Sequence, residues 1–459
     1  MKHIHFIGIC GVGMSGLALA MQKSGYTVTG SDKGFYPPVS TYLKDAGVNY
    51  YAGWHPNKMI EHGEPDIVVV GNVASSTNPE WLYVQEHKLN YVSYPELIKQ
   101  FFLKENSIVC AGTYGKTTTS SLLSWILKHA LFEPSYMFGG LTMNDFPSAG
   151  MGNGNWSVLE GDEYKTARWD MKPKFSHYSP NHLLLTAVQW DHADIYPTEE
   201  EYFTAFRALV NGIPKNGLIV ASESVKDIVR LSDCHVVKYG SDTNNDYVYS
   251  NIVQTKQGIT FDLTHEGTTF AISTPMFGAF NVENIAGCFA MAHQIGIEPK
   301  IIIDSITSFT GLKRRLEKRF EGNLTIFDDI AHSPAKASSV LKTLKSIYNG
   351  KVIAIFEPNT GNRQQESKPS YANAFNDADE VIIPRLTSLK QDPTKPPHID
   401  GQELAEIIHE THDNVHYIEE DEQLIQYILD NTDKDDVIVF LGSHGFRGMI
   451  EELIKCLQS

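Results

Sequence analysis

The sequence predicts an α/β protein of three domains, each built on a mostly parallel sheet. Its 459 residues exceed the roughly 100–200 residues of one ordinary domain. Short apolar runs alternate with helical patterns along most of the chain, which is typical of βαβ units. Two glycine-rich loops each follow an apolar run and precede a helical pattern, an arrangement that favours phosphate binding at a sheet edge.

The order of the apolar runs divides the chain into three segments. The first, 1–103, contains HIHFIGI, YTVTGSD, DIVVVGN and NYVSY, with helical patterns such as MSGLALAMQKSG between them. The second, 104–310, opens with SIVCAG and continues through WSVLEGDE and HLLLTAVQWDH. The third, 311–459, begins with GLKRRLEKRF and repeats the alternation in LTIFDDIA, KVIAIFEP, DEVIIP and DVIVFLGS. We expect one domain from each segment.

The loop AGTYGKTTT at 111–119 has the parts of a phosphate-binding loop. A strand that ends in a glycine turn and leads into a helix offers backbone N–H groups and the positive helix end to phosphate oxygens. Lys116 would meet the outer phosphates, and the Thr117 hydroxyl would bind Mg²⁺. The usual Gly-x-x-x-x-Gly-Lys-Ser/Thr spacing needs a glycine where the sequence has Cys110. A tight strand–helix connection is the alternative, but the complete order of parts favours a nucleotide site.

The second glycine cluster, GICGVGMSG at 8–16, has the layout of a dinucleotide-type site. Gly11, Gly13 and Gly16 give the strict Gly-x-Gly-x-x-Gly spacing, and Asp32 ends the next apolar run. Such glycines let the backbone approach a diphosphate, and the acid meets a ribose; close helix–strand packing is the alternative. Two phosphate-type loops favour an enzyme that binds a nucleoside diphosphate conjugate and consumes a second nucleotide over a nicotinamide oxidoreductase.

Acidic and imidazole side chains end two apolar runs of the second segment. Glu160 ends one run, and Asp191 and His192 end another. Parallel strands bring such ends to one edge of a sheet, and oxygen ligands with one imidazole suit Mg²⁺ shared with phosphate. An acid at a strand end is often only a helix cap, so these residues are candidate ligands.

Composition excludes several classes of function. A net charge of −17 disfavours a nonspecific grip on nucleic acid or on an anionic membrane, and no run of about 18 uncharged apolar residues suggests a membrane span. The start MKHIHFIGIC lacks the pattern of an export signal, and the five cysteines have neither metal nor disulfide spacing. We expect a cytoplasmic protein with small-molecule substrates.

Six motifs together resemble those of one enzyme family. GTYGKTTT, EGDEY, DHADIY, GAFNVEN, GLKRRLE and FDDIAHSP occur in this order over the three segments, and they are similar to the motifs of the Mur ligases, the ATP-dependent amide-forming enzymes of peptidoglycan synthesis. The family's phosphate loop is shortened to Gly-Thr-x-Gly-Lys-Thr/Ser-Thr, which accounts for Cys110. The resemblance implies a Rossmann-like UDP-binding domain, a central P-loop ATPase-type domain and a Rossmann-like C-terminal domain that binds the acceptor and closes the ATP site. It also implies ATP and Mg²⁺ as cofactors and a monomer or weak dimer.

The resemblance assigns roles to individual residues. The implied catalytic set is Lys116, Arg315, Glu160 and His192, and the implied Mg²⁺ ligands are Thr117, Glu160 and His192. The implied ATP site, in which the two asparagines meet the adenine side and the aspartate meets the ribose, comprises Gly112, Thr113, Gly115, Lys116, Thr117, Thr118, Asn281, Asn284, Arg315 and Asp329. The implied UDP-substrate site comprises Gly11, Gly13, Met14, Asp32 and Ser75.

Two acceptors are open within the family. HFIGICGVGMSGLA resembles members that take UDP-N-acetylmuramate as the carboxylate substrate. GSDKGFYPPVSTYL, GNVASSTNPE and DEYKTARWDMKPKFSHY are similar to members that attach the tripeptide L-alanyl-γ-D-glutamyl-meso-diaminopimelate in cell-wall recycling. The alternative acceptor is L-alanine, whose ligases typically have a shorter segment after their Glu-Ala-Asp-Glu motif.

The sequence also departs from the family pattern. Tyr114, Phe280 and Ser333 each stand where the family usually has His, Gln189 stands where it has Glu, and Thr186-Ala187 occupy a position where Asn is common. The lysine, the arginine and the expected metal ligands all remain, so we expect an active enzyme. A UDP-sugar-binding homologue without turnover is the alternative from a different class.

Overall fold

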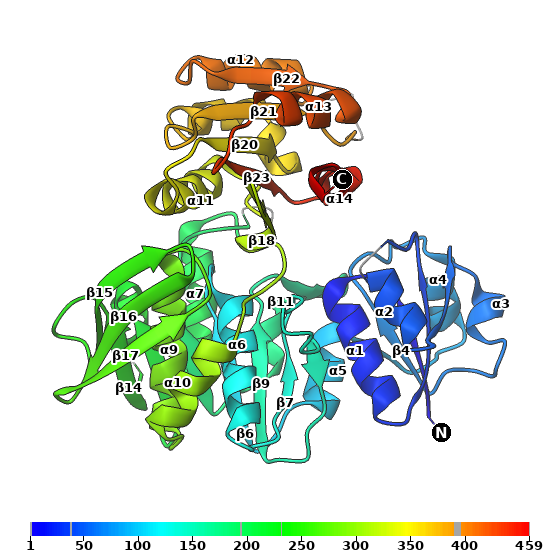
Figure 1. Ribbon diagram of the computed structural model, residues 1–459. Helices are drawn as coiled ribbons and strands as arrows, with labels where there is room; N and C mark the ends of the chain where they lie inside the picture. Colours follow the sequence, from blue (N-terminus) through cyan, green and yellow to red (C-terminus); the bar gives the residue numbers. More distant parts are fainter. Residues whose placement is uncertain (1, 37–38, 193–194, 231, 390–395, 459) are drawn as a thin grey trace. The chain divides into compact units, whose positions relative to one another are not determined.

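The computed structural model describes residues 2–36, 39–192, 195–230, 232–389 and 396–458 (Figure 1). Residues 37–38 and 193–194, which belong to two of the motifs quoted above, therefore lie outside the described residues. The chain divides into two compact units. The first unit contains Met1–Ile252, Thr260–Thr274 and Phe280–Thr310, and the second unit contains Val253–Ile259, Pro275–Ala279 and Gly311–Ser459.

The first unit begins with a five-stranded parallel sheet in the order β3-β2-β1-β4-β5. Its strands are β1 His3–Ile7, β2 Thr27–Asp32, β3 Asn49–Ala52, β4 Ile67–Val70 and β5 Tyr91–Ser93. Its helices are α1 Val12–Lys23, α2 Val39–Asp45, α3 Pro56–Met59, α4 Pro79–Glu86 and α5 Tyr94–Phe101. The order of the strands reverses between β1 and β4, which is the point where such sheets bind nucleotides.

Both faces of this sheet are covered. On β4, Val69 belongs to the core that contains side chains of α1 and α5, whereas Val68 and Val70 belong to the core that contains side chains of α3 and α4. The alternation follows from the two-residue period of a strand. It explains why the run DIVVVGN is continuously apolar rather than alternating.

The same unit continues with a ten-stranded sheet in the order β17-β16-β15-β14-β13-β12-β6-β9-β7-β8. The central strands β14, β13, β12, β6, β9 and β7 are parallel. The strands are β6 Asn106–Ala111, β7 Ser135–Met137, β8 Ala149–Gly150, β9 Trp156–Gly161, β12 His182–Leu185, β13 Leu218–Ser222, β14 His235–Gly240, β15 Tyr247–Thr255, β16 Gly258–His265 and β17 Thr268–Thr274.

Helices cover this sheet as well. They are α6 Lys116–His129, α7 Glu199–Asn211, α8 Lys226–Val229, α9 Phe280–Gln294 and α10 Pro299–Ser308. Helices α6, α9 and α10 contact one another and lie side by side in Figure 1. Tyr202 and Phe206 of α7 share a core with Leu183 and Leu185 of β12. Strands β10 Lys165–Ala167 and β11 Asp170–Pro173 form a separate antiparallel hairpin between β9 and β12 in the chain.

The second unit is built on a six-stranded sheet in the order β18-β19-β23-β20-β21-β22. Its strands are β18 Glu317–Glu321, β19 Thr325–Asp329, β20 Val352–Glu357, β21 Glu380–Pro384, β22 Val415–Ile418 and β23 Val437–Gly442. Only the β18–β19 pair among them is antiparallel. Its helices are α11 Pro334–Ile347, α12 Gly401–His409, α13 Asp421–Asn431 and α14 Met449–Gln458.

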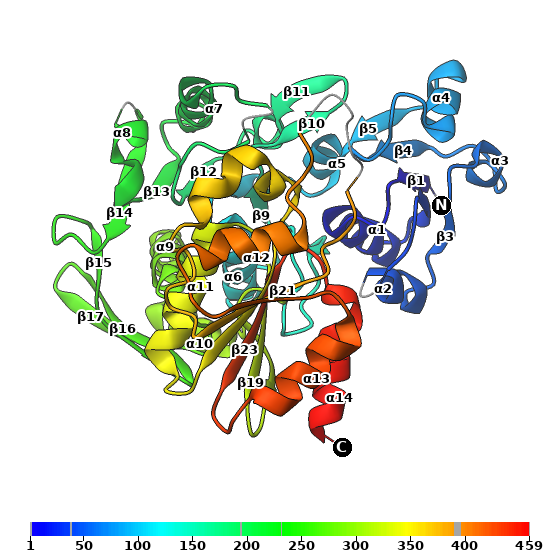
Figure 2. The same cartoon turned by 90° about the horizontal axis from the view of Figure 1, so that it is seen from above.

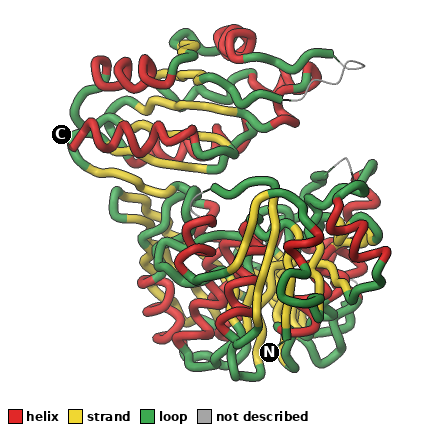
Figure 3. The backbone as a smooth tube through the Cα atoms, turned by 90° about the vertical axis from the view of Figure 1, so that its right-hand side faces the viewer, coloured by secondary structure: helices red, strands yellow, loops and turns green. Residues whose placement is uncertain are grey.

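Two hydrophobic cores lie against this third sheet. One contains side chains of α11 and α12, such as Leu341 and Leu404, and the other contains side chains of α13 and α14, such as Leu424 and Leu453. The protein combines helices and strands throughout, as the tube in Figure 3 and the turned view in Figure 2 show, although β14 to β17 follow one another without a helix between them. The predicted α/β class with Rossmann-like and P-loop sheets is confirmed, whereas the boundaries at 103/104 and 310/311 stay a prediction. None of the helices in the described residues is long and apolar enough to cross a membrane.

Candidate active site

The phosphate-type loop joins β6 to α6 with a backbone that glycine favours. Gly112 and Gly115 have φ of 139° and 83°, conformations that side chains with a Cβ rarely adopt. A Cβ on Gly112 would lie 2.1 Å from the Thr186 hydroxyl, and one on Gly115 would lie 2.2 Å from Oδ1 of Asn284. No side chain caps the helix at Gly115, so the first N–H groups of α6 can bind an anion.

Strand register brings the candidate side chains to the edge that carries this loop. In β9, Glu160 pairs with Cys110 of β6. On the other side of β6, Leu185 of β12 pairs with Ala111, so the chain from Thr186 to His192 also starts beside the loop. This register places Glu160 at the edge that carries the loop. His192 lies beyond the end of β12 at Leu185, so its place in the site stays a prediction.

Lys116 contacts a buried carboxylate that the sequence did not single out. Its Nζ lies 2.9 Å from Oε1 and 2.8 Å from Oε2 of Glu163. The Glu163 side chain is 1% exposed and that of Lys116 is 14% exposed, so the pair is shielded from solvent. A signal was present in the sequence, because Glu163 follows Glu160 by three residues in EGDEY, but only the fold shows which acid faces Lys116.

Glu160 is held by two donors next to Lys116. The Thr117 hydroxyl donates to Oε1 at 3.1 Å, and the Gly139 N–H donates to Oε2 at 2.6 Å. Burial raises the pKa of Glu160, although the Gly139 N–H and the nearby Lys116 lower it in part. Because burial disfavours the ionised form of Glu160, a further cation beside it would stabilise that form.

Asp162 contributes a second ionised acid to the loop region. Its Oδ2 lies 2.6 Å from Nζ of Lys174. Burial alone would raise the pKa of Asp162, but the charges of Lys174 and Lys116 outweigh that effect and hold it below its usual value. Asp162 is thus paired with Lys174 in the way that Glu163 is paired with Lys116.

His192 lies beside Glu163 as well. Its Nε2 is 3.4 Å from Oε1 of Glu163, and its backbone φ is 56°. The hydrogen bond to Glu163 raises the pKa of His192 despite partial burial. The distance links His192 to Glu163 rather than to Glu160, so its assignment as an Mg²⁺ ligand stays a prediction.

Two threonine hydroxyl groups, one in the loop and one after β12, join the loop to the chain that follows β12. Thr186 donates to the backbone oxygens of Ala111 and Tyr114. Thr113 donates to the Gln189 carbonyl at 2.7 Å and accepts the Gln189 N–H at 2.9 Å. Thr186, which departs from the family pattern, therefore holds the loop through its hydroxyl, whereas Gln189 contacts the loop through its backbone.

The two asparagines of GAFNVEN lie in the first turn of α9. Asn284 donates through Nδ2 to Oδ1 of Asn281 at 3.2 Å, and both side chains are buried. Asn284 also approaches Gly115, as the 2.2 Å Cβ distance shows. Phe280, which begins the helix, is 42% exposed, and Tyr114 in the loop is 45% exposed. The remaining loop residue of the prediction, Thr118, is buried in the first turn of α6.

In the second unit, Asp329 organises the turn that carries Arg315. Its Oδ2 accepts the Leu316 N–H and its Oδ1 accepts the Ala331 N–H, each at 2.7 Å. Arg314 binds the carbonyl oxygens of residues 442–444, while Arg315 is exposed. Burial raises the pKa of Asp329, partly offset by these N–H groups.

The expected UDP site lies at the strand-order reversal of the first sheet. Gly11 precedes α1, Gly13 packs so closely that a Cβ would lie 2.8 Å from the Tyr94 hydroxyl, and Met14 is buried. Asp32 accepts the Cys10 N–H at 2.8 Å, and the exposed Ser75 follows β4, with its hydroxyl 3.1 Å from that of Thr77.

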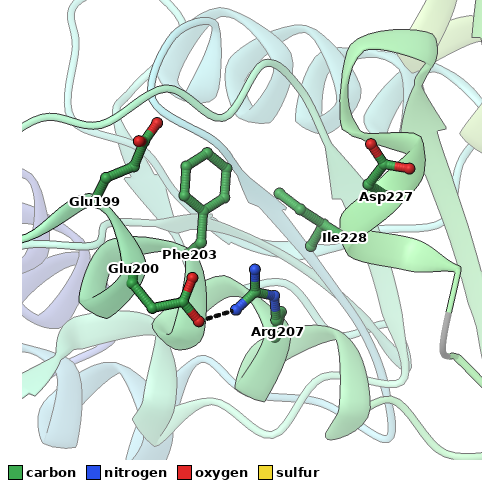
Figure 4. A pocket seen from close by; sticks show the side chains of 6 residues that line it. All are labelled: Glu199, Glu200, Phe203, Arg207, Asp227 and Ile228. Atoms are coloured by element: carbon green, nitrogen blue, oxygen red, sulfur yellow. Dashed lines mark hydrogen bonds and ion pairs between the residues drawn. The ribbon is translucent and has the colours of Figure 1, made fainter.

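The first unit also has a cavity that is separate from the predicted site residues. It encloses about 330 Å³ and is lined by Glu199, Glu200, Phe203, Arg207, Asp227 and Ile228 (Figure 4). Arg207 is engaged by Glu200 at 2.6 Å, and none of the predicted site residues lines this cavity. It does not belong to the phosphate-type loop.

A parallel sheet that presents a P-loop beside buried acids, together with a second nucleotide-type sheet, defines a nucleotide-dependent enzyme of the P-loop class. Three family models cover most of the chain: the "Mur ligase family, catalytic domain" over residues 3–105, the "Mur ligase middle domain" over 110–292 and the "Mur ligase, glutamate ligase domain" over 314–444. The chain belongs to the Mur ligase family. It is therefore an ATP-dependent, ADP-forming ligase that uses Mg²⁺, as predicted.

Three similar proteins within the family are the following. The UDP-N-acetylmuramate–L-alanyl-γ-D-glutamyl-meso-2,6-diaminoheptandioate ligase of Haemophilus influenzae is 30% identical, covering 100% of both chains. The UDP-N-acetylmuramate–L-alanine ligase of Mesorhizobium japonicum is 30% identical over 96% of this chain and 94% of its own. The crystal structure of a murein peptide ligase from Psychrobacter arcticus is 27% identical, covers 100% of this chain and 99% of its own, and has a TM-score of 0.71.

Proposed function

We propose that the chain joins the lactyl carboxylate of UDP-N-acetylmuramate to the amine of L-alanyl-γ-D-glutamyl-meso-diaminopimelate, as a cytoplasmic monomer or weak dimer. The observation that carries the proposal is the presence of two nucleotide-type edges in one unit, the P-loop edge with Lys116 and the strand reversal with Gly11. One edge suits the nucleotide that is consumed, and the other suits a nucleoside diphosphate conjugate. The tripeptide acceptor rests on the full-length similarity to the Haemophilus ligase.

ATP would bind with its phosphates over the uncapped start of α6. The loop residues Gly112, Thr113 and Gly115 supply the backbone cradle, and Thr118 keeps the first turn packed. On ATP binding, the Lys116 ammonium would release the Glu163 carboxylate and bind the outer phosphates instead, because one ammonium can pair with either anion. Asn281 and Asn284 border the loop from α9 and would meet the adenine side.

The residues beside Lys116 fit Mg²⁺ shared with phosphate. The Thr117 hydroxyl and the Glu160 carboxylate oxygen are 3.1 Å apart, and both are the hard oxygen ligands that Mg²⁺ prefers. Within the described residues, no group of three or more His, Cys, Asp or Glu side chains is placed to hold a metal ion. When bound, Mg²⁺ supplies charge neutralisation at the transferring phosphoryl group. His192 is the third proposed ligand.

A carboxylate is a poor acyl donor, so transfer of the γ-phosphoryl group of ATP to the muramyl carboxylate must precede amide formation. The amine then attacks the acyl phosphate, and the tetrahedral intermediate collapses to amide and phosphate. The first step requires mainly positioning and charge. Lys116 supplies part of that charge, and Arg315, presented by the turn that Asp329 holds, would supply the rest after the second unit closes on the first.

The acceptor assay tests this proposal most directly. The protein is incubated with UDP-N-acetylmuramate, ATP, Mg²⁺ and either the tripeptide or L-alanine, and phosphate release and product are measured. We expect turnover with the tripeptide only. Turnover with L-alanine alone would instead support the second candidate, UDP-N-acetylmuramate–L-alanine ligase, which the Mesorhizobium relative favours.

Lys116→Ala controls for the chemistry. We expect this variant to bind UDP-N-acetylmuramate normally and to form no product, because Lys116 lies on the ATP edge. Unchanged ATP-dependent product formation would refute the assigned role. Tight binding of the UDP-sugar by the unmodified chain without turnover on either acceptor would favour a binding protein.

A further inference from the structure

The β10–β11 hairpin connects the two nucleotide edges of the first unit. It begins two residues after Glu163, which contacts Lys116. Strand β10 contacts α5 (Figure 2), and Trp169 in the turn meets Tyr91 of β5, so the turn reaches the other sheet. Neither the glycine motifs nor the P-loop chemistry explains why the β10–β11 hairpin extends to the first sheet.

An aromatic cluster anchors the tip of the hairpin to the first sheet. The Trp169 ring stacks on that of Trp81 with centroids 4.9 Å apart and planes 18° apart, and it meets the Tyr91 ring edge-on at 5.2 Å. Trp81 is 6% exposed, whereas Trp169 and Tyr91 are 39% and 41% exposed, so the cluster is buried only on its Trp81 side. Stacked and edge-on ring pairs each contribute beyond their buried area, and the tip is therefore held in one place.

Polar contacts fix the hairpin to the loop that follows β4. Arg168 donates through Nε to the Ala74 carbonyl at 3.1 Å, and Asn72 donates through Nδ2 to the Lys165 carbonyl at 3.3 Å. This loop borders the strand reversal, since the Gly71 N–H donates to the Ile7 carbonyl at 2.9 Å. Arg168 thus binds a loop that lies next to the end of β1, where the glycine loop with Gly11 begins.

The guanidinium of Arg168 has N–H donors that its contact with Ala74 does not use. Arg168 is exposed, and its Nη1 and Nη2 groups form no hydrogen bond or ion pair with the part of the chain that the structure describes. A guanidinium is matched to phosphate oxygens, which it binds through two parallel N–H groups. The glycine loop beside it provides backbone N–H groups but no side-chain charge.

We propose that Arg168 binds the diphosphate of the UDP-sugar, with its Nε on Ala74 as the anchor and its Nη groups on phosphate oxygens. The inference rests on the proposed function, because it names a further residue of the UDP site. The hairpin then does two things: it adds a cation to the glycine loop, and it holds that cation on the segment that follows Glu160 of β9 and contains Glu163. The nucleotide-sugar is thereby positioned relative to the P-loop.

Titration of the full-length protein with UDP and with uridine tests the role of Arg168. We expect Arg168→Met to weaken UDP binding by about tenfold, in line with the loss of one charge-assisted hydrogen-bonding group. Uridine, which lacks the diphosphate, should bind the variant and the unmodified chain within about twofold. Unchanged UDP affinity in Arg168→Met would overturn the proposal.

Two further variants separate charge from hairpin docking. Arg168→Lys should recover most of the UDP affinity, whereas Arg168→Gln, which keeps a donor for Ala74 but no charge, should not. If glutamine restores affinity as well as lysine, or if uridine binding falls as much as UDP binding, Arg168 acts only by holding the loop. Lys172→Met removes a charge from the exposed end of the same hairpin and should leave UDP affinity unchanged.

The result can be distinguished from failure of the proposed function. If the unmodified chain binds no UDP, the UDP-sugar assignment itself is wrong, whatever the variants do. If it binds UDP and Arg168→Met binds it equally, the assignment stands and the role of Arg168 is refuted. Both measurements are independent of the acceptor.

Discussion

Removing the charge of Glu163 should show how strongly the ligand-free site depends on the Lys116–Glu163 pair. The Nζ lies 2.8 and 2.9 Å from the carboxylate oxygens, and at an effective dielectric constant of about 20 two unit charges about 3 Å apart attract by roughly 5 kcal/mol. Desolvation of a 1% exposed carboxylate offsets much of that attraction, and we expect a coupling free energy of about 2 kcal/mol.

A double-mutant cycle measures this coupling. Glu163→Gln, Lys116→Met and the double variant are compared by hydrogen exchange at the amides of α6, which gives the free energy of local opening. Each single variant should lower that free energy by about 2–4 kcal/mol, because it leaves the other charge buried. The double variant should lower it by less than the sum of the two.

The ion pair of Arg207 and Glu200 is the matched control. It has a comparable distance of 2.6 Å, but its side chains are 41% and 74% exposed. The same cycle on that pair, read at the amides of α7, should give a coupling far smaller than that of Lys116 and Glu163, because water screens exposed charges. A Lys116–Glu163 coupling equally small would refute the conclusion that burial makes this pair strong.

Three further predictions follow from the loop and its neighbours. Gly115→Ala should destabilise the first unit by about 1–3 kcal/mol and abolish ADP binding measured by calorimetry, because φ is 83° and the new Cβ would overlap Asn284. Thr186→Val should cost about 1–3 kcal/mol of local stability by hydrogen exchange, since its hydroxyl bonds two loop carbonyls. Hydrogen bonding to Glu163 raises the pKa of His192, so its stabilising contribution is fully present below the unfolded-state value and is lost as pH rises through the folded-state value. The melting-temperature difference between the unmodified chain and His192→Gln should accordingly be larger at about pH 5.5 than at about pH 8.5.

Each of these predictions has a control and a contrary outcome. Gly445→Ala should be neutral, because Gly445 has φ of −84° and open space around it; equal damage at both glycines would show that φ is not the cause. Thr186→Ser should retain stability, and a loss equal to that of valine would point to the methyl group. A difference for His192→Gln that does not change with pH would contradict the link to Glu163.

The sequence located the phosphate loop because its signal is local. Gly112, Gly115 and Lys116 are close in the chain, and their conformation depends on a turn of a few residues. The position of Glu160 near the end of β9 was also predictable, since apolar runs with βαβ spacing fix a parallel sheet and its carboxyl edge. His192 is different, because β12 ends at Leu185 and His192 lies in the chain that follows it. The family motifs, read together, gave the enzyme class.

The side chains that contact Lys116 and the phosphate loop were not predictable in the same way. EGDEY offers three acids within four residues, and β9 ends among them, so a shift of one residue decides which acid points at Lys116. Thr186 was visible only as an unusual residue, and its contacts cross 72 and 75 residues of chain. Such contacts depend on how neighbouring strands are placed in register, which no local pattern specifies.

The sequence by itself determined the α/β class, the two glycine-rich edges and the family, because periodicity, turn chemistry and motif order are properties of short stretches of chain. Tertiary structure alone decided that Glu163 holds Lys116, that Thr186 braces the loop and that the tip of a hairpin at Arg168 lies against the loop after β4. The physical reason is that these contacts join residues far apart in sequence. Their distances are set by sheet register and core packing, which only the folded chain provides.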